Sequence, residues 1–249
     1  TYFREHLRLF MTASMPEKAH YHDLAQYRVD SMAWETNPLY GWCKKNVKVD
    51  GTHYDLYADG LKIYTTLDPR MQQYAEEAVR EHLSKDLQPL FDKERVHKRN
   101  SPFSNDMTME QINQVLTRSM KQSERYRMAR KEGLKEADIR KMFNQKVNMQ
   151  VFTWNGLRDT LMSPMDSIKH YKAFFRSGFI VMNPKNGHIK AYVGGPDYRY
   201  FMYDMVSSGK RQVGSTIKPI LYTLAMQEGL GPCDKVPNIP QTFLLPDGK

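Results

Sequence analysis

The sequence contains little cysteine, no long apolar run and no initiator methionine. Cys43 and Cys233 are its two cysteines, and their separation gives no metal-ligand spacing, so they are either free thiols or one bridge. No stretch approaches the roughly 18 apolar residues that a transmembrane helix needs, and residues 1–6 lack a signal-peptide pattern. We therefore expect an internal piece of a longer protein, with no transmembrane helix in this part.

Nucleotide-binding and zinc motifs are absent as well. The sequence has no P-loop, no dinucleotide-binding glycine fingerprint and no zinc-finger spacing. His20, His22 and Asp23 could suggest a metal site, but no further cluster of His, Cys or carboxylate residues completes it. We interpret this stretch as a surface loop.

The composition is that of a folded and strongly basic protein. Hydrophobic residues make up 40% and aromatic residues 12% of the 249 residues. These fractions can fill the core of one large or two small domains, and they argue against disorder. The formal net charge of +9 predicts an anionic neighbourhood. Nucleic acid, acidic phospholipid headgroups and anionic polymers all fit that description.

The first predicted helix lies at the N-terminus. Its apolar residues recur at helical spacing and are Phe3, Leu7, Phe10 and Met11. They predict a helix over residues 2–11 that ends before Pro16. Residues 20–59 show no clear period, so we interpret them as an irregular connector of loops and short strands.

A strand, a helix cap and a helix are predicted next. Residues 61–67 (LKIYTTL) alternate and favour β-structure, which predicts a strand. Asp68 is a good N-cap and Pro69 a good first helical residue, so they predict a helix that runs to about Leu87. The expected apolar face of this helix consists of Met71, Tyr74, Ala75, Ala78, Val79 and Leu83.

The central region is predicted to be mainly helical. Residues 92–105 are polar and contain proline, which indicates a loop. Residues 108–111 have capping-box form and predict a helix start, Gly133 interrupts the helical pattern, and residues 135–143 predict a further helix. Basic residues outnumber acidic ones across residues 121–141, and we favour a solvated helical face over an anion-binding role.

A hairpin is the clearest β-structure in the sequence. Residues 151–154 indicate a short strand, and Ser163 begins a predicted helix. Residues 179–182 and 188–193 are β-rich runs, and the loop that joins them has Asn-Gly at its tip. Together they predict an antiparallel hairpin.

The pattern with the clearest chemistry is a Ser-x-x-Lys turn. Residues 211–219 (RQVGSTIKP) precede an apolar run at residues 220–226. The spacing places the Ser215 hydroxyl and the Lys218 amine on one helix face, about one turn apart. The amine can accept the hydroxyl proton, and N–H groups at the helix start can stabilise an oxyanion. The sequence therefore predicts a serine nucleophile with a lysine base.

Further features support this turn or offer alternatives to it. Lys218 must be neutral part of the time to act as a base, and burial, the helix dipole and nearby Lys210 and Arg211 all favour the neutral amine. The residues expected to bury the helix behind the site are Ile220, Leu221, Leu224 and Ala225. The alternative interpretation is that Ser215 is an ordinary helix cap.

Two nearby patterns need separate interpretation. Ser207 and Lys210 also form a Ser-x-x-Lys match, but Gly209 disfavours a helix there, so we reject Ser207 as the nucleophile. Residues 197–204 (DYRYFMYD) interleave aromatic and charged side chains. They fit either a binding groove or a loop packed over the catalytic helix.

Three blocks occur in the order found in one enzyme family. They are residues 60–69 (GLKIYTTLDP), residues 183–195 (NPKNGHIKAYVGG) and residues 211–219. They resemble the domain entry after the glycosyltransferase, the first transpeptidase hairpin and the active-serine motif of class A penicillin-binding proteins, which polymerise and cross-link peptidoglycan. Residues 2–8 resemble the tail that leaves the glycosyltransferase domain.

The resemblance implies an α+β fold. It implies part of a penicillin-binding-protein transpeptidase domain, similar to serine β-lactamases, preceded by a mixed linker region with a helical insertion. The implied divisions are an interdomain linker at residues 1–60, a linker and transpeptidase entry at residues 61–165, and the N-terminal part of the transpeptidase domain at residues 166–249. Residues 92–159 match no general family pattern, and we interpret them as the insertion.

The resemblance also implies a D,D-transpeptidase of cell-wall biosynthesis. Ser215 would form an acyl-enzyme with a peptidoglycan stem peptide ending in D-Ala-D-Ala, Lys218 would be its base, and β-lactams would acylate the same oxygen. No metal or organic cofactor is expected. The implied location is periplasmic, outside the cytoplasmic membrane, with the anchor in another part of the protein. The family's Ser-x-Asn and Lys-Thr/Ser-Gly motifs are missing here, so the chain alone is expected to acylate slowly or not at all.

A function from another class stays open. The chain could be a non-catalytic periplasmic module whose linker and insertion bind envelope proteins. Nucleic-acid binding has only the net charge of +9 in its favour, and we expect none.

Overall fold

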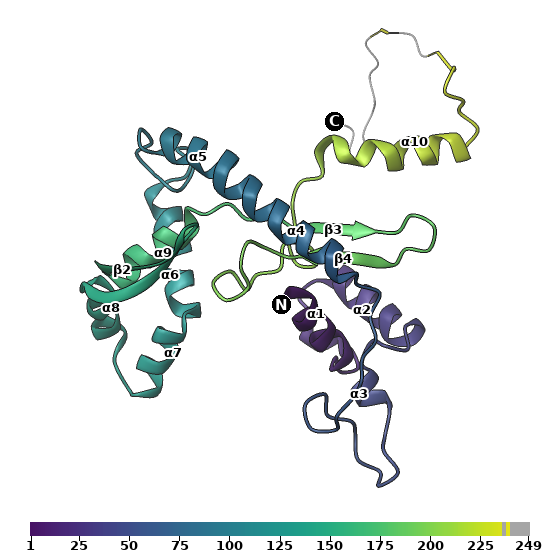
Figure 1. Ribbon diagram of the computed structural model, residues 1–249, viewed down its shortest axis with the longest axis horizontal. Helices are drawn as coiled ribbons and strands as arrows, with labels where there is room; N and C mark the ends of the chain where they lie inside the picture. Colours follow the sequence, from purple (N-terminus) through teal and green to yellow (C-terminus); the bar gives the residue numbers. More distant parts are fainter. Residues whose placement is uncertain (236–237, 240–249) are drawn as a thin grey trace. The chain divides into compact units, whose positions relative to one another are not determined.

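The computed structural model describes residues 1–235 and 238–239 of the chain. It divides into two compact units, Thr1–Gly209 and Lys210–Lys249 (Figure 1). Helices alternate with small antiparallel sheets in the first unit, which confirms the predicted α+β class. The part of the predicted transpeptidase segment at residues 236–237 and 240–249 lies outside the described residues.

Most of the regular structure belongs to the first unit. Its helical segments are α1 (Tyr2–Met11), η1 (Lys18–His20), α2 (Leu24–Thr36), α3 (Trp42–Lys45), α4 (Pro69–Glu81), η2 (His82–Leu87), α5 (Gln88–Arg95), α6 (Met109–Gln122), α7 (Glu124–Lys131), α8 (Glu136–Asn144) and α9 (Pro164–Lys172). Its strands are β1 (Val147–Thr153), β2 (Gly156–Met162), β3 (Phe179–Met182) and β4 (Ile189–Val193). The second unit contains η3 (Gly214–Ile217) and α10 (Lys218–Gln227).

The N-terminal helices include one confirmed and one wrong prediction. α1 spans the predicted residues 2–11. Residues 20–59, predicted as an irregular connector, contain α2 and α3. Asp23 caps α2 by accepting a hydrogen bond from the Ala25 N–H. No residue of α2 is fully buried, so its sequence lacks the single apolar stripe that makes a helix recognisable.

Aromatic side chains pack these N-terminal helices together. The Phe10 and Tyr40 rings meet edge to face with their centroids 5.0 Å apart, and Trp34 meets Tyr40 at 6.5 Å. Gly41 has a φ of +72°, and a side chain at this position would overlap the Trp34 ring. The connector is therefore a packed helical element.

α4 begins as predicted and continues further than predicted. Asp68 accepts hydrogen bonds from the Arg70 and Met71 N–H groups, and Pro69 lies in the first turn. The helix passes through the π-helical segment η2 into α5, so it does not end at Leu87, and the loop predicted over residues 92–105 is helical as far as Arg95.

The buried face of α4 packs against β4. Its fully buried residues are Ala75, Val79 and, in η2, Leu83, and their partners in this core are Ala191 and Val193. Three members of the predicted apolar face lie outside it: Met71 and Tyr74 are 45% and 65% exposed, and Ala78 is exposed as well. The buried stripe is therefore narrower than the sequence indicated.

The strand predicted at residues 61–67 is wrong. The segment runs beside β4 without regular structure. Thr66 Oγ1 donates to the Ile189 carbonyl at 2.8 Å, and the Asp68 N–H donates to the Lys190 carbonyl at 2.9 Å. A strand needs a ladder of backbone hydrogen bonds, and this segment contributes a side chain in place of a backbone group. β-propensity alone did not produce a strand.

The predicted hairpin of β3 and β4 is confirmed. The two strands pair antiparallel, with Phe179 opposite Val193, and a bulge interrupts the register after Val181. Gly187 has the positive φ of +70° that the loop requires. The Gln72 side chain of α4 completes the outer edge of β4, accepting from the Tyr192 N–H at 2.8 Å and donating to its carbonyl at 3.1 Å.

The region from α6 to α9 has its own small core. The predicted capping box is present, since Thr108 and Gln111 each accept a hydrogen bond from the other's backbone N–H. α8 is the helix predicted at residues 135–143, and it contributes Ile139 and Phe143 to the core. The basic residues between Lys121 and Lys141 are exposed, as expected for a solvated helical face.

The sheet of this region is larger than predicted. β1 extends the expected strand at residues 151–154 towards the N-terminus, and β2 was missed. The two strands pair antiparallel around a tight turn, in which Gly156 has a φ of +114°. β2 has no fully buried residue, so its sequence offers little of the β signal that marks a half-buried strand. α9 begins after Ser163, as predicted.

Candidate active site

The Ser-x-x-Lys residues form a tight helical turn in the second unit. Ser215 lies in the 3₁₀ turn η3, and Lys218 is the first residue of α10. The Lys218 N–H donates to the Ser215 carbonyl, which closes the turn between them. Residues three apart eclipse one another in a 3₁₀ turn, so the backbone directs the two side chains towards one face. The Ser215 hydroxyl and the Lys218 amine form no hydrogen bond with each other in the described residues.

The residues around this turn explain its shape. Gly214 has a φ of +52°, a left-handed conformation that glycine adopts without a steric cost. Pro219 lies in the first turn of α10, where its missing N–H removes no intrahelical hydrogen bond. Thr216 Oγ1 donates to the Val213 carbonyl and fastens the start of the 3₁₀ turn.

The helix-cap interpretation of Ser215 finds no hydrogen bond to support it. No side chain caps η3 or α10 through a hydrogen bond. The Ser215 hydroxyl forms no hydrogen bond within the described residues, and its residue is exposed. The N–H groups of a helix's first turn have no intrahelical partner, so they are available to an oxyanion. A free hydroxyl beside such groups suits a nucleophile.

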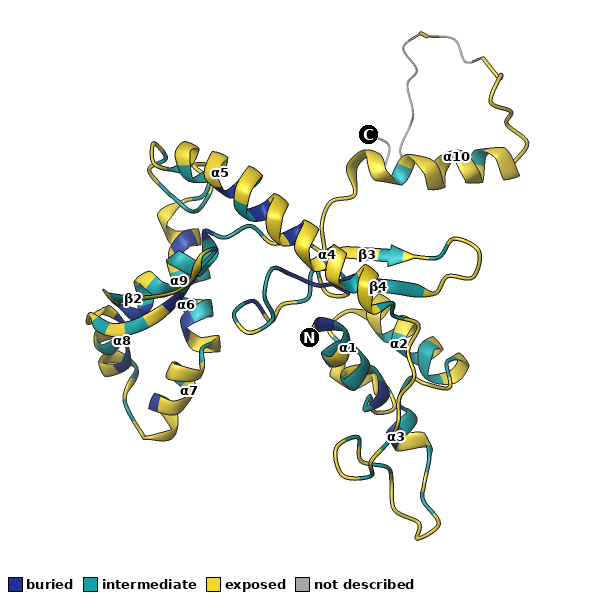
Figure 2. Ribbon diagram, viewed as in Figure 1, coloured by how far each residue is buried: buried dark blue, intermediate teal, exposed yellow. Residues whose placement is uncertain are grey.

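The burial predicted for α10 is wrong in the structure. Ile220, Leu221 and Leu224 are 65%, 53% and 53% exposed, and Lys218 is exposed as well. Figure 2 shows α10 exposed over most of its length, in contrast to the buried positions along α4. Within the described part of the second unit, no further layer covers this apolar surface. The expected desolvation of the Lys218 amine is therefore missing.

The competing serine is held in a different way. Ser207 lies in a turn, where its N–H donates to Asp204 Oδ1 at 3.3 Å. Gly209 approaches the Met205 carbonyl so closely that a side chain would overlap it. Ser207 is therefore not at the start of a helix, in agreement with its rejection as the nucleophile.

The other chemical groups considered from the sequence stay apart. Cys43 is buried and Cys233 exposed, and both are free thiols. Among residues 1–235 and 238–239, no three His, Cys, Asp or Glu side chains gather as metal ligands. His20 lies 3.8 Å from Glu17 in an exposed pair on η1, which is a helical turn rather than the loop expected there.

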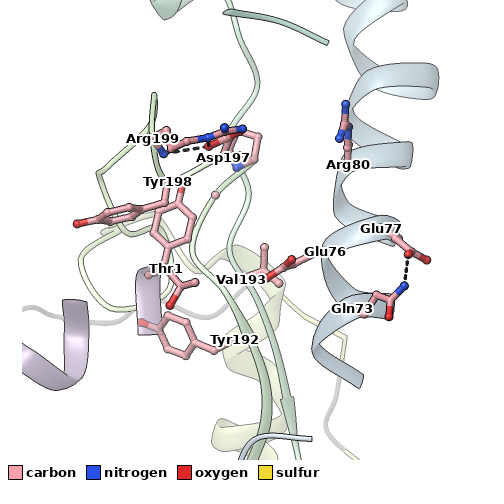
Figure 3. Close-up of a pocket in the computed structure, with 13 residues that line it drawn as sticks. Thr1, Gln73, Glu76, Glu77, Arg80, Tyr192, Val193, Asp197, Tyr198 and Arg199 are labelled. Carbon is pink, nitrogen blue, oxygen red and sulfur yellow. Dashed lines mark hydrogen bonds and ion pairs between the residues drawn. The ribbon is translucent and has the colours of Figure 1, made fainter. Parts of the chain in front are cut away.

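A second candidate site lies in the first unit. A cavity of about 480 Å³ opens between α4 and the residues that follow β4 (Figure 3). Its lining residues are Thr1, Tyr2, Gln73, Glu76, Glu77, Arg80, Tyr192, Val193, Gly195, Pro196, Asp197, Tyr198 and Arg199. We call it the α4 cavity. The aromatic and charged run at residues 197–204 contributes three of these residues, which favours the binding-groove interpretation of that run.

Charged groups in the α4 cavity are partly paired with each other. The Arg199 side chain donates to both Asp197 oxygens, from Nε at 3.2 Å and from Nη2 at 2.8 Å. Burial opposes ionisation of Asp197, but the hydrogen bonds from Arg199 and the nearby charge of Arg80 outweigh it and hold the pKa of that carboxyl below its usual range. Glu76 and Arg80 were not predicted as site residues, because no local sequence pattern indicates that α4 lies beside residues 192–199.

Two family models match the chain. The penicillin-binding protein middle domain matches residues 98–175, and the penicillin-binding protein transpeptidase domain matches residues 177–243. The first range overlaps most of the region interpreted as an insertion, and the second contains Ser215 and Lys218.

Curated relatives are similar over different parts of the chain. Penicillin-binding protein 2D of Bacillus subtilis is 29% identical over 161 residues, 65% of this chain and 20% of the relative. Penicillin-binding protein 1A of Rickettsia bellii is 26% identical over 203 residues, 75% of this chain and 25% of the relative. Penicillin-binding protein 1A of Escherichia coli is 41% identical over 64 residues, 26% of this chain and 8% of the relative. The chain therefore spans at most a quarter of these relatives.

No solved structure is significantly similar to the chain. No helix among the described residues combines the length and the apolar character that crossing a bilayer requires.

Proposed function

This chain belongs to the class A penicillin-binding proteins, and we propose that it carries the nucleophile of a peptidoglycan-cross-linking D,D-transpeptidase at Ser215. The observation that supports this most is the tight backbone turn between Ser215 and Lys218, which lies within the residues that match the transpeptidase domain. The alternative of a plain helix cap has no hydrogen bond in its favour.

In the proposed reaction, Lys218 serves Ser215 as a general base. The Lys218 amine takes the Ser215 Oγ proton while Oγ attacks the penultimate D-Ala carbonyl of a stem peptide. The Ser215 N–H donates to the oxygen that becomes negative. The C–N bond then breaks, the terminal D-Ala amine receives the proton, and an acyl-enzyme is left. An amine of a neighbouring stem peptide then attacks this ester, the bond between the acyl carbon and Ser215 Oγ breaks, and the proton lost by the amine returns to Oγ as the cross-link forms.

Several features of the longer protein follow from this proposal. β-Lactam antibiotics acylate Ser215 Oγ in place of the peptide. The chemistry requires no metal or organic cofactor, because the hydroxyl, the amine and backbone N–H groups supply every proton and charge. The reaction takes place at the periplasmic side of the cytoplasmic membrane, where peptidoglycan lies, with a membrane anchor and a glycosyltransferase domain elsewhere in the protein.

We expect the 249-residue chain by itself to acylate slowly. Lys218 and the apolar residues behind it are exposed, so the described residues do not exclude water from this turn. The chain also lacks Ser-x-Asn and Lys-Thr/Ser-Gly motifs after Ser215.

A fluorescent penicillin tests the assignment of the nucleophile. In the full-length protein, we expect covalent labelling that Ser215→Ala abolishes. Ser207→Ala is the matched control, because Ser207 has the same spacing to a lysine and is not in a helix start. Labelling that survives Ser215→Ala, or that Ser207→Ala removes, would contradict the proposal. Rapid labelling of the 249-residue chain would contradict only the expected slow acylation.

A non-catalytic binding role is a second candidate for the N-terminal part. Val29 and Met32 of α2 are 56% and 59% exposed on the side away from Trp34, so this helix has apolar residues on two sides. A pull-down of envelope proteins by the chain, compared with a Val29→Ser/Met32→Ser variant, tests this role. Capture that is unchanged by the variant would remove the support that α2 gives it.

A further inference from the structure

The α4 cavity is built from two segments that are more than 100 residues apart in the sequence. One wall is α4, which contributes Glu76 and Arg80, and the other is the segment Tyr192–Arg199. Figure 3 shows Glu76 pointing from α4 towards Val193, whereas Glu77 pairs with Gln73 at the rim. Every lining residue belongs to the first unit.

Aromatic groups form much of the remaining wall. The Tyr2 and Tyr198 rings meet edge to face with centroids 5.1 Å apart, and the Tyr2 hydroxyl is committed to the Phe201 carbonyl at 2.6 Å. A smaller cavity of about 140 Å³ adjoins the first, shares Arg80 and Asp197 with it, and extends to Trp154. The two cavities therefore form a cleft, longer than a single side chain and aromatic along its wall.

Three charged groups of the cleft, Arg80, Glu76 and Glu77, keep unused bonding capacity. Arg80 donates to the Trp154 carbonyl at 3.3 Å, and a guanidinium has four further N–H donors. Glu76 accepts one hydrogen bond, from Gln72 at 2.6 Å, and a carboxylate can accept about four. Asp197 and Arg199, in contrast, neutralise each other.

The charges of Arg80 and Glu76 indicate which kind of ligand the cavity can bind. Arg80 and Glu76 are four residues apart on one helix, about 6 Å along its axis. A ligand with a charge of one sign would be attracted to one of them and repelled by the other. A ligand that carries both a carboxylate and an amine can pair with both, the carboxylate on Arg80 and the amine on Glu76.

We propose that the α4 cavity binds a zwitterionic peptide, and that this peptide is a peptidoglycan stem peptide bound away from Ser215. The assignment to a stem peptide rests on the proposed function, in which the substrate supplies both a terminal carboxylate and an acceptor amine. The site holds the peptide without reacting with it, since its serine-free lining contains no nucleophile beside a base. The cavity would therefore be a second binding site for the polymer that the protein cross-links.

Photo-crosslinking in the full-length protein tests this site. The probe is the peptide L-Ala-D-Glu-L-Lys-D-Ala-D-Ala with a diazirine at its N-terminus, and mass spectrometry locates the labelled residues. We expect labels on α4 or on residues 192–199. The apparent Kd should rise about tenfold or more for Glu76→Gln and for Arg80→Gln, since each removes one charge-assisted contact.

Glu81→Gln is the matched control, because Glu81 is exposed on the same helix and does not line the cavity. Glu76 and Glu81 each accept one hydrogen bond from a side chain four residues away, Glu76 from Gln72 and Glu81 from Lys85. A C-terminal carboxamide on the probe should remove the effect of Arg80→Gln, and acetylation of its lysine should remove the effect of Glu76→Gln. Thermal melts of the variants establish that each is folded.

The possible outcomes test the α4 site and the stem-peptide assignment separately. Equal effects of Glu76→Gln and Glu81→Gln, or labels confined to the region of Ser215, would overturn the α4 site. Equal affinity for the all-L form of the peptide would overturn the stem-peptide assignment and leave a general peptide site. Penicillin labelling of Ser215 is read separately, so a failure of the proposed function is distinguishable from a failure of this site.

Discussion

Two helices of this protein start alike and end up in different environments. α4 and α10 both have proline in the first turn, after a segment that fixes the approach of the chain. α4 has the Asp68 cap and buries a stripe of residues against β4, whereas α10 has no side-chain cap and no buried residue. The start of a helix is therefore decided by a few adjacent residues, while its burial depends on what the rest of the fold places beside it.

The largest difference between the two helices is expected for core truncations. Leu83→Ala removes a side chain that is 4% exposed and should lower the free energy of unfolding by about 2–5 kcal/mol. Leu224→Ala should change it by no more than about 0.5 kcal/mol, since Leu224 is exposed. Urea unfolding of the chain measures both. Equal effects would mean that α10 is buried in solution.

A smaller difference is expected between Gln88, which begins the α5 continuation of α4, and a glutamine of α10. The buried Gln88 side chain donates to the Ala173 carbonyl at 3.0 Å and accepts from the Phe175 N–H at 3.2 Å. Gln88→Leu leaves both groups without a partner and should cost about 1–3 kcal/mol of unfolding free energy. Gln227→Leu, on exposed α10, is the control and should have little effect. A neutral Gln88→Leu variant would show that this contact contributes nothing.

Substitutions just before the two helices should have different effects, one on thermal stability and the other on penicillin labelling. Asp68→Ala removes a cap and should lower the Tm by about 2–4 °C. Ser215→Ala should leave the Tm unchanged, because Ser215 caps nothing, and yet abolish penicillin labelling of the full-length protein. Calorimetry of both variants provides the measurement, and a drop in Tm for Ser215→Ala would restore the helix-cap interpretation.

The smallest expected effect is a pH dependence confined to α4. The hydrogen bond from the Met71 N–H, aided by the one from Arg70 and opposed by desolvation, lowers the pKa of Asp68. A carboxyl with a lowered pKa stabilises the fold above its unfolded pKa of about 3.9, and this contribution is lost as the pH falls through the folded pKa. The Tm difference between the protein and Asp68→Asn should therefore shrink below about pH 4. A constant difference from pH 5 to pH 2 would contradict this assignment.

Local signals in the sequence predicted the helix starts and the hairpin. Asp68 with Pro69, Thr108 with Gln111, and the Asn-Gly turn each determine the backbone through contacts within a few residues. The turn between Ser215 and Lys218 belongs to the same class, since one backbone hydrogen bond closes it. These features were predictable because they need no distant partner.

The wrong predictions depended on distant partners. Residues 61–67 have the β-propensity of a strand, but a strand also needs a ladder of backbone hydrogen bonds. At this edge, β4 instead forms hydrogen bonds with the side chains of Thr66 and Gln72. α2 was missed because its apolar residues lie on two sides, and the burial of α10 was inferred from hydrophobicity alone. Arg80 and Asp197 both line the α4 cavity, and nothing in their spacing along the sequence indicates that they share a site.

The glutamine at the edge of β4 also sets the direction in which its sheet can grow. Asp68 occupies the Lys190 carbonyl, and the Gln72 amide occupies both backbone groups of Tyr192, as a neighbouring peptide unit would. This edge of β4 cannot pair with another strand, because these N–H and C=O groups are already hydrogen-bonded. Any additional strand must therefore join at β3, so the hairpin is extended from one side only.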